Sequence, residues 1–413
     1  MTKKSYGQIK YACYMVNVSM SVVATLSPLL FLTFRSLYNI SFSLLGALVL
    51  INFCTQLAVD LILSFYSHKF NISKMVKITP VLTALGLFIY AAFPFIFPNE
   101  VYIGLVIGTV IFSASGGLAE VLISPVIAEL PSDNPEREMS KLHSIYAWGV
   151  VVVVIISTLL LLALGKENWQ WLALFWMIVP LLSCCLFLKS TVPQLKTPEK
   201  SSNVVSLIKQ KDFISCFFCI FLGGASECTM SQWSSSYIEQ ALNIPKVWGD
   251  IFGVAMFAVM LGLGRTLYSK YGKNIYKILA ISAMGATVCY IVATISRVPL
   301  IGLFSCAMTG LCTAMLWPGS IIVASDKFPS AGLAIFALMA AGGDLGGAIG
   351  PQLVGTVADN AMTNEHIYHL STVFNMTTEQ MAMKIGLLSA IAFPLFATIL
   401  YIKNYIKRKQ SIK

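Results

Sequence analysis

The sequence predicts an all-α membrane protein with twelve transmembrane helices arranged as two six-helix bundles. Of its 413 residues, 57% are hydrophobic and only 11% are charged, whereas about 25% of residues are charged in soluble domains. The apolar residues gather in segments long enough to cross a bilayer, and most of the 28 Lys and Arg residues lie between these segments. Together these observations exclude a soluble fold.

Twelve apolar segments follow one another along the chain. Most hold about 20 residues or more, which at about 1.5 Å per residue is enough to cross about 30 Å of hydrocarbon. They cover residues 11–34, 44–67, 76–97, 101–129, 141–164, 169–190, 212–239, 247–269, 276–295, 299–326, 330–359 and 382–403.

The basic residues predict how these segments are oriented. With the N-terminus in the cytoplasm, the connections on the cytoplasmic side hold most of the 28 Lys and Arg residues, as the positive-inside rule requires. We therefore expect both termini in the cytoplasm, at a plasma (inner) membrane. The basic start, residues 1–10, leads straight into a full-length apolar segment, so we expect a retained first helix and not a cleaved signal peptide.

One connection divides the chain into two halves. Residues 191–211 are rich in Lys, Ser and Pro, with six apolar segments before them and six after. We therefore expect an N-terminal bundle over 1–190, a cytoplasmic linker over 191–211 and a C-terminal bundle over 212–413. The spacing from Gly117 to Pro125 in the fourth segment recurs from Gly310 to Pro318 in the tenth, which indicates a duplication.

Composition and motifs exclude several classes of function. The net charge is +10, but dispersed basic residues do not favour nucleic-acid binding. The C-x-x-C of Cys216 and Cys219 lies in an apolar segment without a second pair, so we expect neither a metal site nor a disulfide framework. No nucleophile and base are placed as a hydrolase would need them. We expect a monomer with no cofactor and no enzymatic activity.

Four acidic residues lie inside apolar segments: Asp60, Glu120, Glu227 and Asp344. A charge at the bilayer centre costs at least several kcal/mol, so such residues usually face a bundle interior or a water-filled path. We expect all four to be buried. Protonation removes the charge and would let the two halves move past each other, so these acids are the candidates for proton coupling.

Two helix faces are candidates for the wall of a transport cavity. Asn52, Gln56 and Asp60 recur every fourth residue, which puts them on one face of the second segment. The alternative is that they only form hydrogen bonds between helices, and Asp60 is also a candidate partner in a gate. Asn17 starts a weaker polar face in the first segment, where Ser and Thr often bond their own backbone.

The seventh and tenth segments carry a second group of candidates for substrate binding. Glu227, Gln232, Trp233 and Tyr237 share the seventh segment, and Trp317 precedes a proline in the tenth. A sugar presents apolar faces and hydroxyl groups, so its site combines aromatic rings with polar side chains. The alternatives are an interfacial aromatic belt or core packing.

Two further residues are candidates for a gate or a structural role. Arg265 is the basic residue inside an apolar segment, and Asp344 lies among glycines that permit close helix approach. A pair between them would be structural or part of a gate, and the alternative for Asp344 is contact with substrate or ion. His143 is a candidate proton shuttle, or it only anchors a loop.

The whole layout resembles the major facilitator superfamily. That family carries a loop signature, G-x-x-x-D-R-x-G-R, after the second segment, where this chain keeps only the basic position, as Lys69. After the eighth segment, Gly272 and a basic residue are retained but the acid is not. Within the superfamily the chain is similar to the fucose permease branch, through Glu120 followed by Ser124 and Pro125 and through residues 142–146, 227–237 and 342–351.

This resemblance implies a two-bundle fold with a central cavity and alternating access, and it assigns proton coupling to Glu120. The first segment lacks the acid that the fucose permease has there. We therefore predict a secondary active transporter that imports a sugar or similar small polar solute with protons. Alternatives are a cation- or proton-coupled exporter of amphipathic, drug-like compounds, a sodium-coupled or uniport sugar carrier, and a sensor or scaffold without transport.

Overall fold

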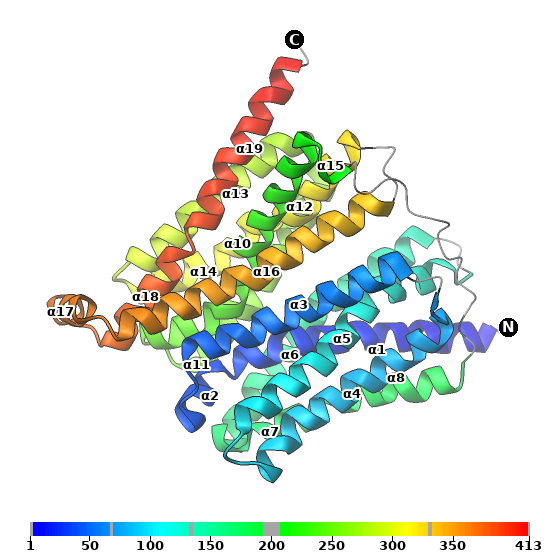
Figure 1. Cartoon of the computed structure of the whole chain (residues 1–413), viewed down its shortest axis with the longest axis horizontal. Coiled ribbons are helices and arrows are strands. Elements are labelled where there is room, and N and C mark those ends of the chain that lie inside the picture. The colour runs from blue at the N-terminus through cyan, green and yellow to red at the C-terminus, as the bar shows by residue number, and fades with distance from the viewer. Residues whose placement is uncertain are drawn as a thin grey trace. The chain divides into compact units, whose positions relative to one another are not determined.

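The computed structural model describes residues 3–66, 69–131, 135–190, 192, 207–328 and 333–411, and every regular element in them is a helix (Figure 1). In chain order these are α1 (Lys3–Leu29), α2 (Phe31–Tyr38), α3 (Phe42–Tyr66), α4 (Ile72–Ile96), α5 (Val101–Ala128), α6 (Pro135–Leu164), η2 (Lys166–Asn168), α7 (Trp169–Trp176), α8 (Ile178–Leu188), α10 (Lys211–Leu242), α11 (Lys246–Gly249), η3 (Asp250–Ala255), α12 (Met256–Tyr271), α13 (Ile275–Ile295), α14 (Pro299–Thr313), α15 (Leu316–Lys327), α16 (Leu333–Met362), α17 (Glu365–Val373), α18 (Thr378–Ser389) and α19 (Ala392–Ser411).

The helices are of membrane-spanning length and composition. Within the described residues, 11 helical stretches are long and apolar enough to cross a bilayer. Helix α16, with 30 residues, is also long enough. The predicted all-α membrane fold is therefore confirmed, while the orientation of the termini and the choice of membrane stay predictions.

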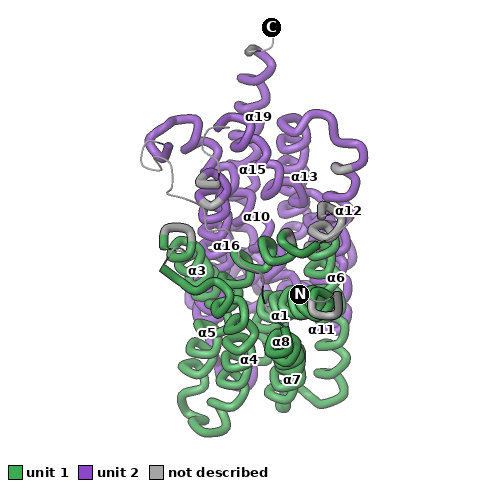
Figure 2. The backbone as a smooth tube through the Cα atoms, turned by 90° about the vertical axis from the view of Figure 1, so that its right-hand side faces the viewer, with its two compact units in different colours: residues 1–33, 51–200 green, residues 34–50, 201–413 purple. Residues whose placement is uncertain are grey.

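Packing divides the chain into two compact units (Figure 2). Unit 1 holds residues 1–33 and 51–200, and unit 2 holds residues 34–50 and 201–413. Helix α3 begins in unit 2 and ends in unit 1. The predicted bundles over 1–190 and 212–413 stay a prediction, and most of the predicted linker over 191–211 lies outside the described residues.

Unit 2 anchors the start of α3 through its N-terminus. Asp359 on α16 accepts hydrogen bonds from the backbone N–H groups of Phe42 (3.0 Å) and Ser43 (2.6 Å). A carboxylate there satisfies backbone donors that no helical carbonyl reaches and interacts favourably with the helix dipole. Arg35 on α2 forms an ion pair of 2.5 Å with Glu379 on α18. Sequence reasoning missed both contacts, since Asp359 only marks the end of a predicted segment.

Unit 2 is built on the close approach of α10 and α16, which pack along each other. A Cβ atom at Gly346 would lie 2.0 Å from the carbonyl oxygen of Phe221, and one at Gly224 would lie 2.5 Å from that of Gly343. Only glycine permits backbones this close, as small residues do at helix contacts in membranes. The contact positions Glu227 on α10 and Asp344 on α16.

Four of the predicted single segments are interrupted helices among the described residues. The first is interrupted at Leu30, between α1 and α2, and the sixth at Met177, between α7 and α8. The other two are the tenth and the twelfth. The tenth is interrupted at Ala314 and Met315, between α14 and α15, and the twelfth at Ala390 and Ile391, between α18 and α19. In each of these last two cases a proline follows, Pro318 or Pro394, and lacks the N–H that would bond the carbonyl four residues earlier. In the tenth segment this frees the Ala314 carbonyl inside an apolar span.

Candidate functional site

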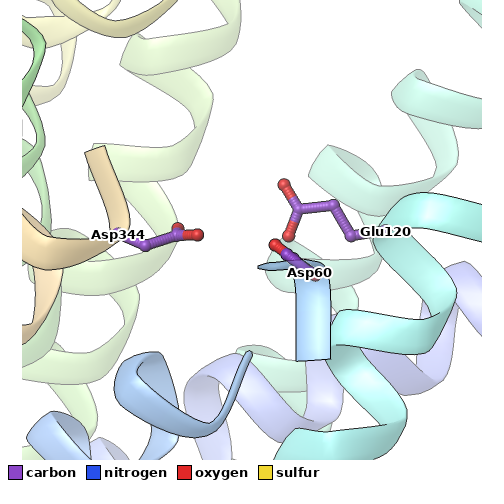
Figure 3. Close-up of side chains that lie close together, drawn as sticks. All are labelled: Asp60, Glu120 and Asp344. Carbon is purple, nitrogen blue, oxygen red and sulfur yellow. The ribbon is translucent and has the colours of Figure 1, made fainter. Parts of the chain in front are cut away.

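Unit 1 brings two of the predicted acids together. Carboxylate oxygens of Asp60 on α3 and Glu120 on α5 lie within 4.8 Å of each other, and Figure 3 shows their side chains on neighbouring helices. Gly117, one helical turn before Glu120, makes the approach possible. A Cβ atom there would lie 2.9 Å from Val59 Cβ and 3.1 Å from an Asp60 carboxylate oxygen. Asp344, drawn in the same figure, belongs to unit 2.

The expectation that all four acids are buried holds for Asp344 alone. Asp60 and Glu227 are half-buried, and the side chain of Glu120 is exposed. Helix α5 buries the neighbouring Leu118, Ala119, Leu122 and Ile123 in the core of unit 1, so Glu120 points away from that core. Asp60 is half-buried, and one of its carboxylate oxygens is enclosed without a hydrogen-bond partner among the described residues. The pair thus combines an enclosed carboxylate oxygen of Asp60 with the exposed carboxylate of Glu120.

The predicted polar face of α3 exists, and it is linked to α5. The Gln56 side-chain amide donates to the Asn52 side-chain oxygen at 3.1 Å, and the Ser113 hydroxyl on α5 donates to the same oxygen at 2.5 Å. Both contacts leave the Asn52 oxygen occupied by protein donors. They favour the alternative role for Asn52, hydrogen bonding between helices.

Asn17 also joins two helices. It is buried, and its side-chain amide donates to the Leu142 carbonyl on α6 at 2.8 Å. Ser21 donates to the Tyr146 carbonyl on the same helix at 2.9 Å, and Thr25 bonds the backbone of its own helix. The structure therefore favours a structural role for this face of α1, because its polar atoms are engaged within unit 1.

In unit 2 the basic residue of the eighth segment meets an acid, but not the one expected. The predicted Asp344–Arg265 pair is not formed within the described residues. Arg265 instead contacts Glu227 on α10 at 3.4 Å and donates from Nε to the freed Ala314 carbonyl at 3.2 Å. Asp344 is buried, 3% exposed, and the adjacent Gly343 lies against the half-buried ring of Trp317.

The two aromatic candidates of α10 lie in the core of unit 2. Trp233 and Tyr237 are both fully buried. The Trp233 indole N–H donates to the Pro351 carbonyl at 2.9 Å, and the Tyr237 hydroxyl donates to the Ala293 carbonyl at 2.7 Å. The contacts favour core packing for both, while Gln232, on the same helix, is half-buried. The side chain of His143 on α6 lies outside the described part of the chain.

Replacing Trp233 by phenylalanine tests this structural role. The change removes one buried hydrogen bond, while the Pro351 carbonyl lies within α16 and keeps its helical donor. We therefore expect the free energy of unfolding in detergent to fall by about 0.5–1.5 kcal/mol from the lost hydrogen bond, with no change in solute affinity. Trp148→Phe is the control, because Trp148 is 65% exposed. If Trp233→Phe leaves stability unchanged but abolishes solute binding, the structural role is wrong and Trp233 contacts the solute.

A further buried charge went unnoticed in the sequence. Asp250 in η3 is 1% exposed, accepts a hydrogen bond from Ser235 on α10, and forms an ion pair of 3.1 Å with Lys246, four residues earlier. The spacing of Lys246 and Asp250 on a helix was the available signal. The Asp250 carboxylate is matched by Lys246 and Ser235 within unit 2, so it is not part of the candidate site.

The fold and these intramembrane charges define a polytopic membrane transporter. The chain belongs to the Major Facilitator Superfamily, whose family model matches residues 12–351. Comparison with curated proteins finds no match.

Solved transporter structures have the same fold. A bacterial homologue of the human lysosomal transporter Spinster is 13% identical, with a TM-score of 0.74 and 97% of each chain covered. A D-xylose–proton symporter is 15% identical, with a TM-score of 0.71 and 94% of this chain and 97% of the other covered. A variant of the E. coli fucose:proton symporter is 13% identical, with a TM-score of 0.57 and 95% and 99% covered.

Proposed function

We propose that this transporter is a proton-coupled symporter of a sugar or similar small polar solute, with Asp60 and Glu120 as its coupling pair. The observation that carries the proposal is the approach of their carboxylate oxygens to within 4.8 Å. Two negative charges this close repel each other, and the enclosed Asp60 oxygen is shielded from the water that would weaken the repulsion. The pair therefore favours a bound proton or another cation, and the exposed Glu120 gives that cation a route to solvent.

Two further findings support proton coupling. Glu120 is the residue at which the chain is similar to the fucose permease branch, and the fold is shared with a D-xylose–proton and a fucose:proton symporter. Sodium is the second candidate for the driving ion, because carboxylate oxygens are also ligands for hard cations. If binding of the solute and of the cation are coupled, each must strengthen the other by the same factor.

The test is uptake into liposomes that enclose a pH-sensitive dye, with no imposed gradient. We expect an added solute to acidify the lumen, and we expect Glu120→Gln to abolish the acidification while solute binding in detergent is retained. Glu100→Gln is the matched control, because Glu100 lies exposed just before α5 and its side chain caps nothing. Solute uptake without proton movement would contradict the proposal, and a sodium requirement would assign the driving force to that ion.

A further inference from the structure

Arg265 carries a guanidinium group with unused hydrogen-bonding capacity inside an apolar segment. Arginine has five N–H donors, and the described residues engage only Nε, with Ala314, and one terminal nitrogen, with Glu227. The Arg265 side chain is 44% exposed. A cation in a membrane span is expensive unless it faces water or a partner, so an accessible, partly unused guanidinium indicates a ligand.

The backbone around Arg265 positions it for such a ligand. Pro318 has no N–H for the Ala314 carbonyl, and the Arg265 Nε fills that place at 3.2 Å. Gly264 permits the approach of α12, since a Cβ atom there would lie 2.5 Å from Ala314 Cβ and 3.1 Å from the Leu311 carbonyl oxygen. The Nε of the guanidinium is therefore held at the helix break, and of its two terminal nitrogens only Nη2 has a partner among the described residues, Glu227.

The contact with Glu227 is not that of a closed structural ion pair. Its 3.4 Å separation exceeds the roughly 2.7–2.9 Å that is usual for charge-assisted hydrogen bonds. The second carboxylate oxygen of Glu227 is buried with no hydrogen-bond partner in the described part of the chain. Only Glu227 is largely enclosed in this pair, and an enclosed carboxylate offsets its desolvation only with good geometry and full hydrogen bonding, which Glu227 lacks.

We propose that Arg265 binds a carboxylate of the transported solute, which takes the place of Glu227 on the terminal guanidinium nitrogens. A planar carboxylate matches that edge with two parallel hydrogen bonds. The solute class is then a small polar molecule with a carboxylate, either a sugar acid or an amino acid. A neutral sugar would leave the guanidinium unmatched. This assignment rests on the proposed transport of a polar solute and narrows its chemistry.

Matched probe pairs test the proposal on the purified full-length protein in detergent, with binding followed by thermal stabilisation. Galacturonate differs from galactose by one carboxylate, and alanine differs from alaninamide in the same way. We expect a carboxylate member to bind and its partner without a carboxylate to bind at least about tenfold more weakly. Binding of galacturonate alone identifies a sugar acid, and binding of alanine alone identifies an amino acid.

Variants then locate the interaction. Arg265→Gln is expected to weaken binding of the carboxylate at least about tenfold, Arg265→Lys to retain part of it, and Glu227→Gln to strengthen it by removing the competing carboxylate. Arg297→Gln is the control, since Arg297 lies between α13 and α14 and stacks on Phe374. If Arg265→Gln does not fold, the probe pairs and Glu227→Gln decide.

Three outcomes overturn the proposal: equal binding of the probes with and without a carboxylate, no binding of either carboxylate probe, or unchanged binding in Arg265→Gln. These measurements need no gradient and are independent of coupling. A neutral sugar that drives proton entry would therefore overturn the carboxylate site while leaving the Asp60–Glu120 proposal intact. Carboxylate binding without proton movement would contradict the Asp60–Glu120 proposal and leave the carboxylate site intact.

Discussion

Replacement of Gly346 by alanine is expected to prevent α10 and α16 from packing and to remove most of the folded protein. The added Cβ atom would lie 2.0 Å from the Phe221 carbonyl oxygen and 2.8 Å from the Ala225 backbone nitrogen. Neither backbone atom can move aside as a flexible side chain could, so we expect a cost above the roughly 1–3 kcal/mol of ordinary overpacking. Size-exclusion chromatography and thermal unfolding in detergent measure the loss.

Gly262→Ala is the matched control, because a Cβ atom at Gly262 would meet nothing within 4 Å. Alanine is also the better helix former, by about 1 kcal/mol in a helix interior. We therefore expect the control to match or exceed the wild-type stability. A Gly346→Ala protein as stable as the wild type would show that α10 and α16 are not in contact at this position.

Loss of either member of the Asp60–Glu120 pair is expected to abolish accumulation of solute driven by a proton gradient. For one proton per solute, a pH difference of one unit stores about 1.4 kcal/mol and supports about tenfold accumulation. We expect Asp60→Asn and Glu120→Gln each to reduce the ratio to about one, while exchange of solute without a gradient continues. The readout is labelled solute inside and outside proteoliposomes.

The double variant, Asp60→Asn with Glu120→Gln, tests whether the two acids act as one site. If both carboxylates hold one cation, the first substitution already removes its site, and the second adds nothing further. The Glu100→Gln variant should accumulate solute as the wild type does. Independent, additive effects of the two substitutions, or accumulation that survives in either single variant, would show that the two acids do not act as one coupling site.

The sequence predicted most residues of the candidate site but not which of them contact each other. All four intramembrane acids and Arg265 stand out because charges are rare in apolar segments. The pairing of Arg265 was predicted incorrectly, since Asp344 and Glu227 are equally plausible partners along the chain. In the structure Arg265 donates from Nε to the freed Ala314 carbonyl, and in this position its guanidinium contacts Glu227.

The roles of polar side chains were harder to predict than their positions. Asn17 and Trp233 have residue types suited to binding a solute, yet each donates to a backbone carbonyl of another helix. Glu120 was expected to be buried, facing a bundle interior or a water-filled path, and is exposed. In each case the spacing along the sequence predicts the face of the helix on which the residue lies. It does not predict which other helix packs against that face.

By itself the sequence determined that this chain is an all-α membrane protein, because apolar length and the need to satisfy every backbone group in lipid leave helices as the solution. It did not determine where helices break, since α14 and α18 end shortly before a proline whereas α4, α5 and α16 continue through one. Only the tertiary structure decided which charges meet and how closely α10 and α16 approach. Those outcomes depend on contacts between residues far apart in the chain, where one missing Cβ atom at Gly346 or Gly117 sets the distance.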